Sequence, residues 1–340
     1  LFQTADATHE ADDAAMAVPR GIERAQVTTA SAEAPELAIG AHCKRPYECP
    51  FIAHCWVDVP DDSVHTLYRG GDRAHKLWSQ GVRTLADIHP GEKVSAPQAV
   101  QISAARTGEP YVDREAIGAF LEGLRFPLCF LDFETFQTAV PLYSGVHPYQ
   151  QIPFQFSLHI LASPDAAPVH HEFLAAGAGD PRPTLLAALG AAIGEHGSVV
   201  SYNASFEQTR LSEMATAFSA HEPWIRRLLR RFNRADLFQP FRSFSYYDPR
   251  QRGSTSIKHV LPVLTTISYA HLPIANGAAA SSEFLRIALR EPHAEEVDRV
   301  RHELLRYCEQ DTFGLVEIYQ RLRQLVAGHL AAPLVHESCD

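Results

Sequence analysis

The 340-residue sequence contains no run of about 18 or more apolar residues, the length that an ordinary transmembrane helix needs. It also contains no basic segment followed by a short apolar one and no lipidation motif, so nothing in it indicates export or a lipid anchor. Its composition is 46% hydrophobic, which is enough to bury a sizeable core in one large domain or two ordinary ones. We therefore expect a globular cytoplasmic protein that does not bind membranes.

Positive charge is also scarce overall, because 30 Lys and Arg face 40 Asp and Glu. The resulting net charge of −10 argues against a protein that coats nucleic acid unspecifically. The charge is unevenly distributed: residues 1–40 hold seven acids and two arginines in an Ala-rich stretch that we expect to be disordered. Residues 224–260 instead hold eight arginines and Lys258 against two aspartates, which suits phosphate binding. The alternative for "WIRRLLRRFNR" is a solvated helix face.

The pattern of the chain predicts a small N-terminal part before a large α/β domain. The stretch "AHKLWSQGVRTLADI" has apolar residues at roughly helical spacing around Gly81. It is similar to half of a helix-hairpin-helix, although a packing hairpin without a ligand is the alternative. We predict that "SAPQAVQISAARTGEPYVD" is a linker, so a chain from about Arg114 onward is expected to fold by itself. The predicted segments are an acidic tail, a cysteine segment, a small helical region with the linker, the main domain and a C-terminal tail, at 1–37, 38–60, 61–112, 124–328 and 329–340.

The main domain begins with three closely spaced strands, "PLCFLDFE", "PFQFSLHIL" and "VHHEFLA", which predict an antiparallel meander. A helix "PTLLAALGAAIGEH", a short buried strand "GSVVSYN" and a helix "SFEQTRLSEMATAF" capped by Ser205 follow. This order, βββαβα, is that of the RNase H-like fold. We expect Cys129 and Cys308 to be buried, and the histidines of "VHH" at 169–171 to form a strand edge rather than a metal site.

Three separate segments carry acidic residues at the ends of predicted elements. Asp132 and Glu134 end the first strand and point to one face, because side chains alternate across a strand. Such a buried pair needs a cation, a hydrogen-bond network or a shared proton, unless the strand end simply faces solvent. Glu207 follows a strand-to-helix junction, and Tyr307 and Asp311 share one face of a late helix. Oxygen ligands of this kind suit Mg²⁺ or Mn²⁺.

Together these motifs resemble the DnaQ-like, DEDD-type 3′-to-5′ exonuclease superfamily, over about residues 126–326. The resemblance implies an RNase H-like mixed sheet flanked by helices, and hydrolysis of phosphodiester bonds in DNA or RNA. It implies single-stranded 3′ ends as the substrate and two Mg²⁺ or Mn²⁺ ions as cofactors. It also implies that Tyr307 positions the attacking water and that the metal ligands are Asp132, Glu134, Glu207 and Asp311.

The resemblance further implies substrate-binding residues. Asn203 and Phe206 match the residues before the second acidic position. "SIKHVLP" resembles a short helix that several of these exonucleases place near the substrate, so Lys258 is a candidate phosphate contact, with an ordinary surface lysine as the alternative. The rival function is a catalytically degenerate module that binds nucleic acid or acts as a scaffold on the same fold.

Two positions depart from the family pattern or compete with it. Glu207 stands where the family usually has Asp, so an additional methylene must be accommodated, and Asp236 is a second candidate carboxylate unless it only caps a strand end. His293 and Asp298 have the spacing of the histidine subtype. We prefer Tyr307, because a strong amphipathic helix continues from it whereas His293 follows a proline at the start of that helix.

Three cysteines, Cys43, Cys49 and Cys55, lie within 13 residues. They resemble the cluster that closes the iron–sulfur domain of RecB-like nucleases, which implies a [4Fe-4S] site that is incomplete in this chain. A Cys₃His zinc site with His42 or His54 is the alternative. The cluster together with an exonuclease-like domain resembles the bacterial proteins grouped as domain of unknown function 2779. In those proteins a RecB-like segment precedes, and since this chain begins at Leu1 rather than Met, we expect such a segment to be missing here.

Overall fold

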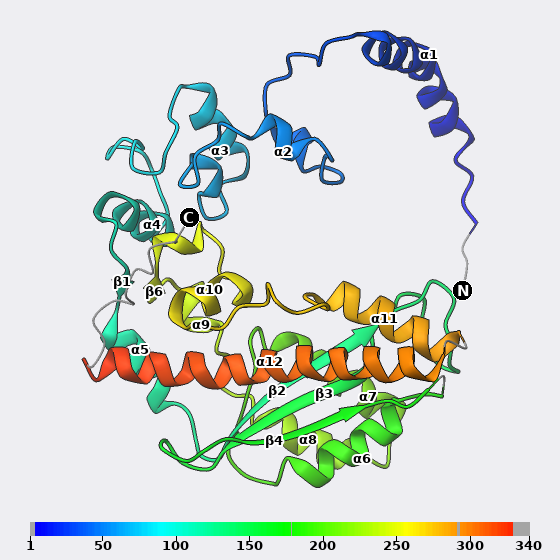
Figure 1. The fold of residues 1–340 in the computed structure, drawn as a ribbon, viewed down its shortest axis with the longest axis vertical. Coiled ribbons are helices and arrows are strands. Elements are labelled where there is room, and N and C mark those ends of the chain that lie inside the picture. Colours follow the sequence, from blue (N-terminus) through cyan, green and yellow to red (C-terminus); the bar gives the residue numbers. More distant parts are fainter. Residues whose placement is uncertain (1–3, 178, 291–292, 329–340) are drawn as a thin grey trace.

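The computed structural model describes residues 4–177, 179–290 and 293–328, and its centre is a four-stranded mixed sheet (Figure 1). The strand order is β4-β3-β2-β5, with antiparallel β2–β3 and β3–β4 pairs and a parallel β2–β5 pair. A parallel bridge from Ser201 to Asp236 extends the sheet beyond β5. The predicted meander and the strand that follows the first helix are thus confirmed. The strands are β2 (Leu128–Phe136), β3 (Ile152–Leu161), β4 (Val169–Leu174) and β5 (Ser198–Val200).

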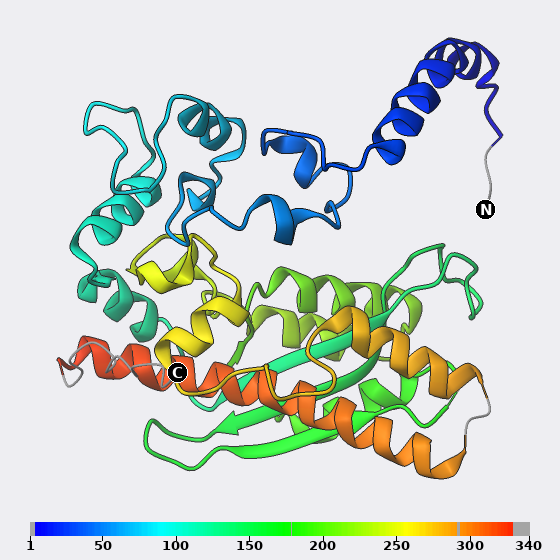
Figure 2. The same cartoon turned by 45° about the horizontal axis from the view of Figure 1, so that its top comes forward.

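Helices cover both faces of this sheet because β2 alternates apolar side chains between two cores. Phe130 belongs to the core on one face, and Leu131 and Phe133 belong to the core on the other. The long helix α12 lies across the first face (Figures 1 and 2). That face is covered by α5 (Arg114–Glu122), α9 (Gln239–Arg242), α10 (Ile257–Leu264), α11 (Gly277–Leu289) and α12 (Ala294–Val326). The other is covered by α6 (Arg182–Ala192), α7 (Ser205–Ala217) and α8 (Glu222–Arg230).

The predicted acidic tail contains an exposed helix, α1 (Thr8–Ala30), where the composition predicted disorder. No residue of α1 is buried against the described part of the chain, and Figure 2 shows the helix apart from the sheet. The alanines that leave this segment without a core also favour helix, so local propensity explains its conformation. The predicted C-terminal tail, 329–340, lies outside the described residues. Within the described part of the chain, no helix is long and apolar enough to cross a bilayer.

The small N-terminal region folds around its own apolar cluster. Leu77, Leu85 and Ile88 are buried there, as the packing hairpin requires. The stretch after Gly81 is not helical, however, and Thr84 instead pairs with Ser63 in an isolated bridge, so the second helix of a helix-hairpin-helix is not formed. The elements are η1 (Ala41–Cys43), α2 (Ile52–Cys55), η2 (Val64–Thr66) and α3 (Gly71–Ser79).

The prediction of a linker over residues 95–113 was wrong, because this stretch contains α4 (Ala96–Thr107). Ser95 and Gln98 form a capping box at its start. After α4, the short strand β1 (Tyr111–Val112) pairs with β6 (Tyr246–Tyr247) of the main domain. The chain therefore passes directly from the small region into the large one.

Close contacts join the two regions. The backbone at Gly253, which precedes α10, approaches Thr66 so closely that a Cβ at this position would lie 1.8 Å from the Thr66 carbonyl oxygen. The rings of Tyr68 and Phe244 pack with centroids 4.7 Å apart, and Arg252 forms an ion pair with Asp61. The small region is thus packed onto the main domain just before α10, the helix that carries Lys258.

Candidate active site

The fold brings the four predicted acidic ligands close together where the sheet meets α12. Asp132 and Glu134 lie on the face of β2 that α12 covers, Glu207 lies in the first turn of α7 directly after β5, and Asp311 lies in the middle of α12. The negative charge of Asp132 acts on each of the other three carboxyl groups. Asp132 is partly exposed, whereas Glu134, Glu207 and Asp311 are only 7%, 3% and 9% exposed.

This crowding changes the protonation of all four groups. Burial raises the pKa of Asp132 to about 6. Burial and the charge of Asp132 raise the pKa of Asp311 to about 8, even though hydroxyl groups nearby lower it. The pKa values of Glu134 and Glu207 are also raised well above their usual range, first by burial and then by the neighbouring carboxylates. The four groups cannot all be ionised at neutral pH without cations to balance them.

The donor set fits divalent cations. Oε2 of Glu207 is buried and has no hydrogen-bond partner among the described residues, which is costly for a carboxylate oxygen unless an ion satisfies it. Four carboxylates from three elements offer the hard oxygen ligands of Mg²⁺ or Mn²⁺. Glu207 lies beside the other carboxylates in spite of its longer side chain, since the charge of Asp132 contributes to the raised pKa of Glu207 and the residue is only 3% exposed.

The structure separates the two candidates for the residue that accompanies Asp311. Tyr307 is 4% exposed, and its hydroxyl lies close enough to Asp311 to lower the pKa of that carboxyl. His293 and Asp298 are both exposed at the beginning of α12. Since a helix rises about 1.5 Å per residue, His293 lies roughly 20 Å along the axis from Tyr307. Of the two candidates, the tyrosine therefore lies beside the carboxylates.

Lys258, on α10, and Tyr269, in the loop that follows α10, also lie beside the carboxylates. Lys258 is half-buried; its Nζ donates a 2.6 Å hydrogen bond to the carbonyl of Ala275 and lies 5.5 Å and 5.6 Å from the ring centroids of Tyr269 and Tyr307. It is therefore not an ordinary surface lysine. Tyr269 donates a hydrogen bond to Asp311. The sequence did not predict this contact, because Tyr269 lies in a loop without any motif or periodicity.

Asn203, Phe206 and Asp236 lie at the junction between β5 and α7. Asn203 is exposed and has a left-handed backbone (φ 66°), a conformation that Asn tolerates well. The backbone amides of Asn203 and Phe238 both donate to Oδ1 of Asp236, so Asp236 caps this turn. Phe206 is partly exposed and lies under the guanidinium of Arg210, 5.1 Å from the ring centroid.

A second polar group lies beneath α12, next to the carboxylates. The Thr312 hydroxyl is hydrogen-bonded to the Ser157 hydroxyl at 2.6 Å and to Nδ1 of His159 at 2.8 Å. The Ser157 hydroxyl is also hydrogen-bonded to Nε2 of His170 at 2.9 Å. His170 in turn lies 3.7 Å from Glu309. His170 thus belongs to a hydrogen-bond network that connects β3 and β4 to α12. Ligand atoms of His159, His170 and Glu309 lie within 4.8 Å of one another, so these three side chains could also hold a metal ion.

The cysteine segment does not form a cluster. Cys43 is buried, Cys49 is half-buried and Cys55 is exposed. Within the described ranges, no group of three or more metal-ligating side chains with atoms inside 4.8 Å includes any of these cysteines, or His42 or His54. A metal in this segment, iron–sulfur or zinc, stays a prediction of the sequence. Cys129 and Cys308 are buried as expected.

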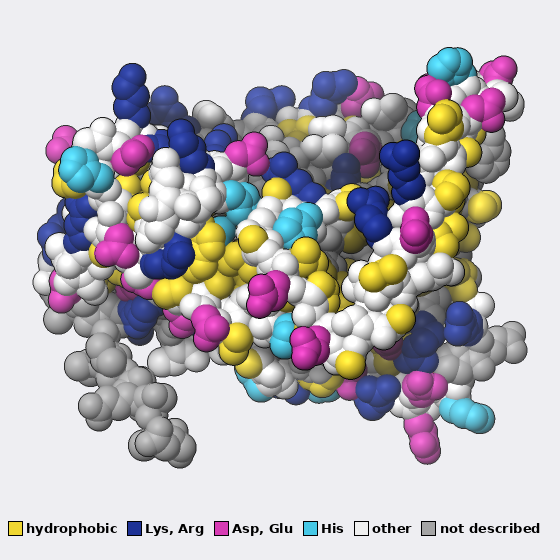
Figure 3. Space-filling view, turned by 90° about the horizontal axis from the view of Figure 1, so that it is seen from above, with side chains coloured by type: hydrophobic (Ala, Val, Ile, Leu, Met, Phe, Trp, Pro, Cys, Tyr) yellow, Lys and Arg dark blue, Asp and Glu magenta, His cyan; other side chains and the backbone are white. Residues whose placement is uncertain are grey.

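The arginine-rich stretch is partly used by the fold itself. Arg226, Arg250 and Arg252 form ion pairs with Glu222, Asp248 and Asp61. The guanidinium of Arg231 donates to backbone carbonyls between β5 and α6. These contacts hold Arg226, Arg231, Arg250 and Arg252 within the protein. Figure 3 shows that Lys and Arg side chains are interspersed with acidic ones over the face of the molecule seen from above.

Comparisons with known proteins found one family model and two relatives that are similar to this chain. The family model described as a domain of unknown function, DUF2779, matches residues 129–256, which include Asp132, Glu134 and Glu207. An uncharacterized MG366 homologue of Mycoplasma pneumoniae is 28% identical over 223 residues, covering 59% of this chain and 33% of that protein. The uncharacterized protein MG366 of Mycoplasma genitalium is 29% identical over 140 residues, covering 38% of this chain and 21% of that protein. The chain thus spans a third or less of the length of these relatives. No solved structure matches it.

Proposed function

We propose that this protein is a metal-dependent 3′-to-5′ exonuclease with an RNase H-like domain. The observation that carries the proposal is the convergence of Asp132, Glu134, Glu207 and Asp311 from three elements, with one carboxylate oxygen of Glu207 buried and unpartnered among the described residues. The strand order β4-β3-β2-β5, extended by the bridge from Ser201 to Asp236, supports the RNase H-like assignment.

The four carboxylates would hold two divalent cations, Mg²⁺ or Mn²⁺, which when bound activate a water and stabilise the leaving 3′-oxygen. Water attacks the phosphorus of the terminal nucleotide, the bond to the 3′-oxygen of the preceding nucleotide breaks, and that oxygen takes up a proton. The buried hydroxyl of Tyr307 beside Asp311 orients the attacking water. The ammonium of Lys258, which lowers the pKa values of Glu134 and Asp311 by its charge, offsets the negative charge of the scissile phosphate.

The residues at the start of α7 favour a single strand as the substrate. Phe206 is partly exposed beside Glu207, so its ring can stack on an unpaired terminal base. Asn203 presents an exposed amide at the same turn. Both residues read features common to DNA and RNA, and we propose no preference between the two.

The proposal is tested by incubating the full chain with a 5′-labelled single strand of DNA or RNA and Mg²⁺ or Mn²⁺. We expect progressive shortening from the 3′ end, release of mononucleotides, and no cleavage in EDTA. A strand that ends in a phosphorothioate linkage should resist, which separates exonuclease from endonuclease activity. Asp132→Ala should be inactive, and Asp298→Ala, which removes an exposed acid from the start of α12, should be fully active.

The second candidate function is a catalytically degenerate module that binds nucleic acid. Glu207 favours it, because the family usually has the shorter aspartate at this position. Such a protein would retain a labelled strand in a gel-shift or anisotropy measurement without shortening it. If the wild-type chain binds the strand without cleaving it and Glu207→Asp cleaves it, the protein is a catalytically degenerate binding module rather than an exonuclease.

A further inference from the structure

Tyr269 lies in the loop between α10 and α11, and its hydroxyl donates a 2.5 Å hydrogen bond to Oδ1 of Asp311. The tyrosine is 7% exposed, and its ring meets that of Tyr307 edge to face with centroids 6.3 Å apart. A bond this short from a hydroxyl to a carboxylate is of the strong, charge-assisted type. It holds Oδ1 of Asp311.

The loop is attached to α12 next to this bond. Gln310, which precedes Asp311, donates from Nε2 to the carbonyl of Ser268 at 3.3 Å, and Ser268 precedes Tyr269. Two neighbouring residues of the loop are therefore bonded to two neighbouring residues of the helix. The aromatic ring of Tyr269 also lies against Lys258.

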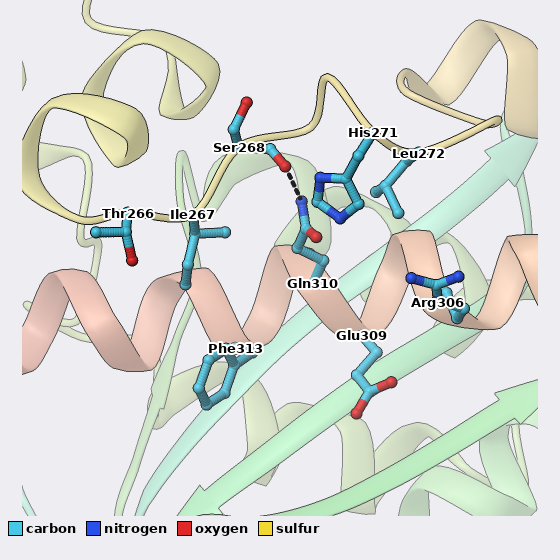
Figure 4. A pocket seen from close by; sticks show the side chains of 9 residues that line it. All are labelled: Thr266, Ile267, Ser268, His271, Leu272, Arg306, Glu309, Gln310 and Phe313. Carbon is cyan, nitrogen blue, oxygen red and sulfur yellow. Dashed lines mark hydrogen bonds between the residues drawn. The ribbon is translucent and has the colours of Figure 1, made fainter. Parts of the chain in front are cut away.

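Beside these bonds a pocket of about 450 Å³ lies between the loop and α12, and Figure 4 shows Gln310 and Ser268 bonded at its edge. Its lining includes Ile267, His271, Arg306 and Phe313. Tyr269 and Leu272 also belong to the apolar core that α12 covers, so packing keeps the loop beside α12 and the hydrogen bond aligns the Tyr269 hydroxyl with Asp311.

We propose that Tyr269 is a positioning residue that fixes the carboxylate of Asp311 for metal binding. The terminal torsion of an Asp side chain is broad, so Asp311 needs an external partner to hold one orientation. Partners of this kind, which touch the ligand and not the metal, typically change metal affinity by 10- to 100-fold when removed. The inference rests on the proposed function only in that Asp311 is a metal ligand.

The test is Mn²⁺ binding to the full chain, measured by calorimetry and by the loss of the free Mn²⁺ paramagnetic signal. We expect Tyr269→Phe to weaken binding by about 10- to 100-fold and Gln310→Ala to weaken it by less. Tyr246→Phe is the matched control, because the Tyr246 hydroxyl is buried with no partner among the described residues and lies in β6. In hydrolysis assays, Tyr269→Phe should need correspondingly more Mn²⁺ for half-maximal rate, with an unchanged KM for the oligonucleotide.

The outcomes separate this inference from the proposed function. If Tyr269→Phe binds Mn²⁺ as tightly as the wild type, or if Tyr246→Phe weakens binding equally, the positioning role is overturned while nuclease activity can still stand. If Tyr269→Phe weakens binding and the wild type does not cleave, Tyr269 positions Asp311 in a metal site that is not an exonuclease. A wild-type chain that binds no Mn²⁺ overturns both.

Discussion

The thiol of Cys308 lies 3.7 Å from Oδ2 of Asp132, although the two residues are 176 positions apart. Cys308 is fully buried, and it stands between Tyr307 and Asp311 on α12. Burial, followed by the charge of Asp132, raises the pKa of its thiol, so it stays protonated as a weak donor. The contact shows that α12 packs closely against β2. The distance between Asp311 on α12 and the two acidic residues on β2 depends on this packing.

Replacing Asp132 or Asp311 by Ala should abolish nuclease activity while leaving the fold intact. Each change removes a proposed metal ligand rather than an apolar packing group, and loss of such assistance commonly costs at least about 10²–10⁴ in rate. Single-turnover hydrolysis of a labelled strand measures the effect, with circular dichroism to check the fold. Turnover close to that of the wild type in either variant would refute the site.

Tyr307→Phe should slow hydrolysis less than the loss of a carboxylate, and His293→Ala should have almost no effect. The Tyr307 hydroxyl is buried beside Asp311, whereas His293 is exposed at the start of α12. The test is the rate of strand hydrolysis by each variant under saturating Mg²⁺, compared with that of the wild type. The reverse order of effects would restore the histidine-subtype assignment.

Without metal, the protein should lose stability as the pH rises. The pKa values of Asp132 and Asp311 are raised to about 6 and about 8 in the folded state, so the folded state binds more protons than the unfolded state at intermediate pH. The stabilisation that protonated Asp132 and Asp311 contribute is present below about pH 4, the usual aspartate value, and is lost as the pH rises through 6 and then 8.

Asp132→Asn provides the matched measurement. In EDTA, its free energy of unfolding should equal that of the wild type near pH 4 and exceed it by on the order of 1–3 kcal/mol at pH 8. Mg²⁺ or Mn²⁺ should raise the midpoint of thermal unfolding of the wild type and not that of the variant. Urea titrations of both proteins at several pH values measure this difference in the free energy of unfolding. A difference that did not grow with pH would contradict its electrostatic origin.

A chain that begins at Arg114 should be unstable, contrary to the expectation from the sequence. The cut removes β1, which pairs with β6, and Asp113, whose side chain caps α5. It also exposes Phe244 and Tyr247, which are buried against α4. A chain that begins at Asp61 keeps these contacts and should unfold in one cooperative transition. Equal melting midpoints for the two shortened chains would show that α4 contributes nothing.

The cysteine segment makes a prediction about bound metal. If Cys43, Cys49 and Cys55 need a further ligand from residues that precede this chain, the purified protein should contain little iron, and a longer natural chain should be brown. A complete zinc site would instead contribute about 10–16 kcal/mol of binding free energy, and a chelator would melt the segment. Elemental analysis of the present chain decides between them, since stoichiometric zinc would overturn the incomplete-cluster hypothesis.

The sequence alone was sufficient for the elements whose apolar periodicity is strong. The strands β2 to β5 and the helices α6, α7 and α12 lie where local patterns predicted them. The same is true of the pairs Asp132 with Glu134 and Tyr307 with Asp311, because the periods of strand and helix place the members of each pair on one face. These inferences need only the geometry of a single element.

The helix α4 shows where periodicity is misleading. Its buried face includes Gln98 and Gln101, and polar residues at core positions hide the apolar pattern. Both side chains are accommodated by hydrogen bonds to the backbone around η2, in Tyr68 and Thr66. Such partners lie 30 or more positions away, so local sequence could not predict them.

The tertiary structure alone decided which side chains surround the carboxylates. Tyr269 reaches Asp311 across 42 positions, Lys258 is turned inward by the carbonyl of Ala275, and Asp236 is occupied by two backbone amides. None of these roles has a local signature, because each depends on where loops end after long-range packing. Sequence patterns define the faces of individual elements, whereas the meeting of those faces depends on contacts between residues that are far apart in the chain.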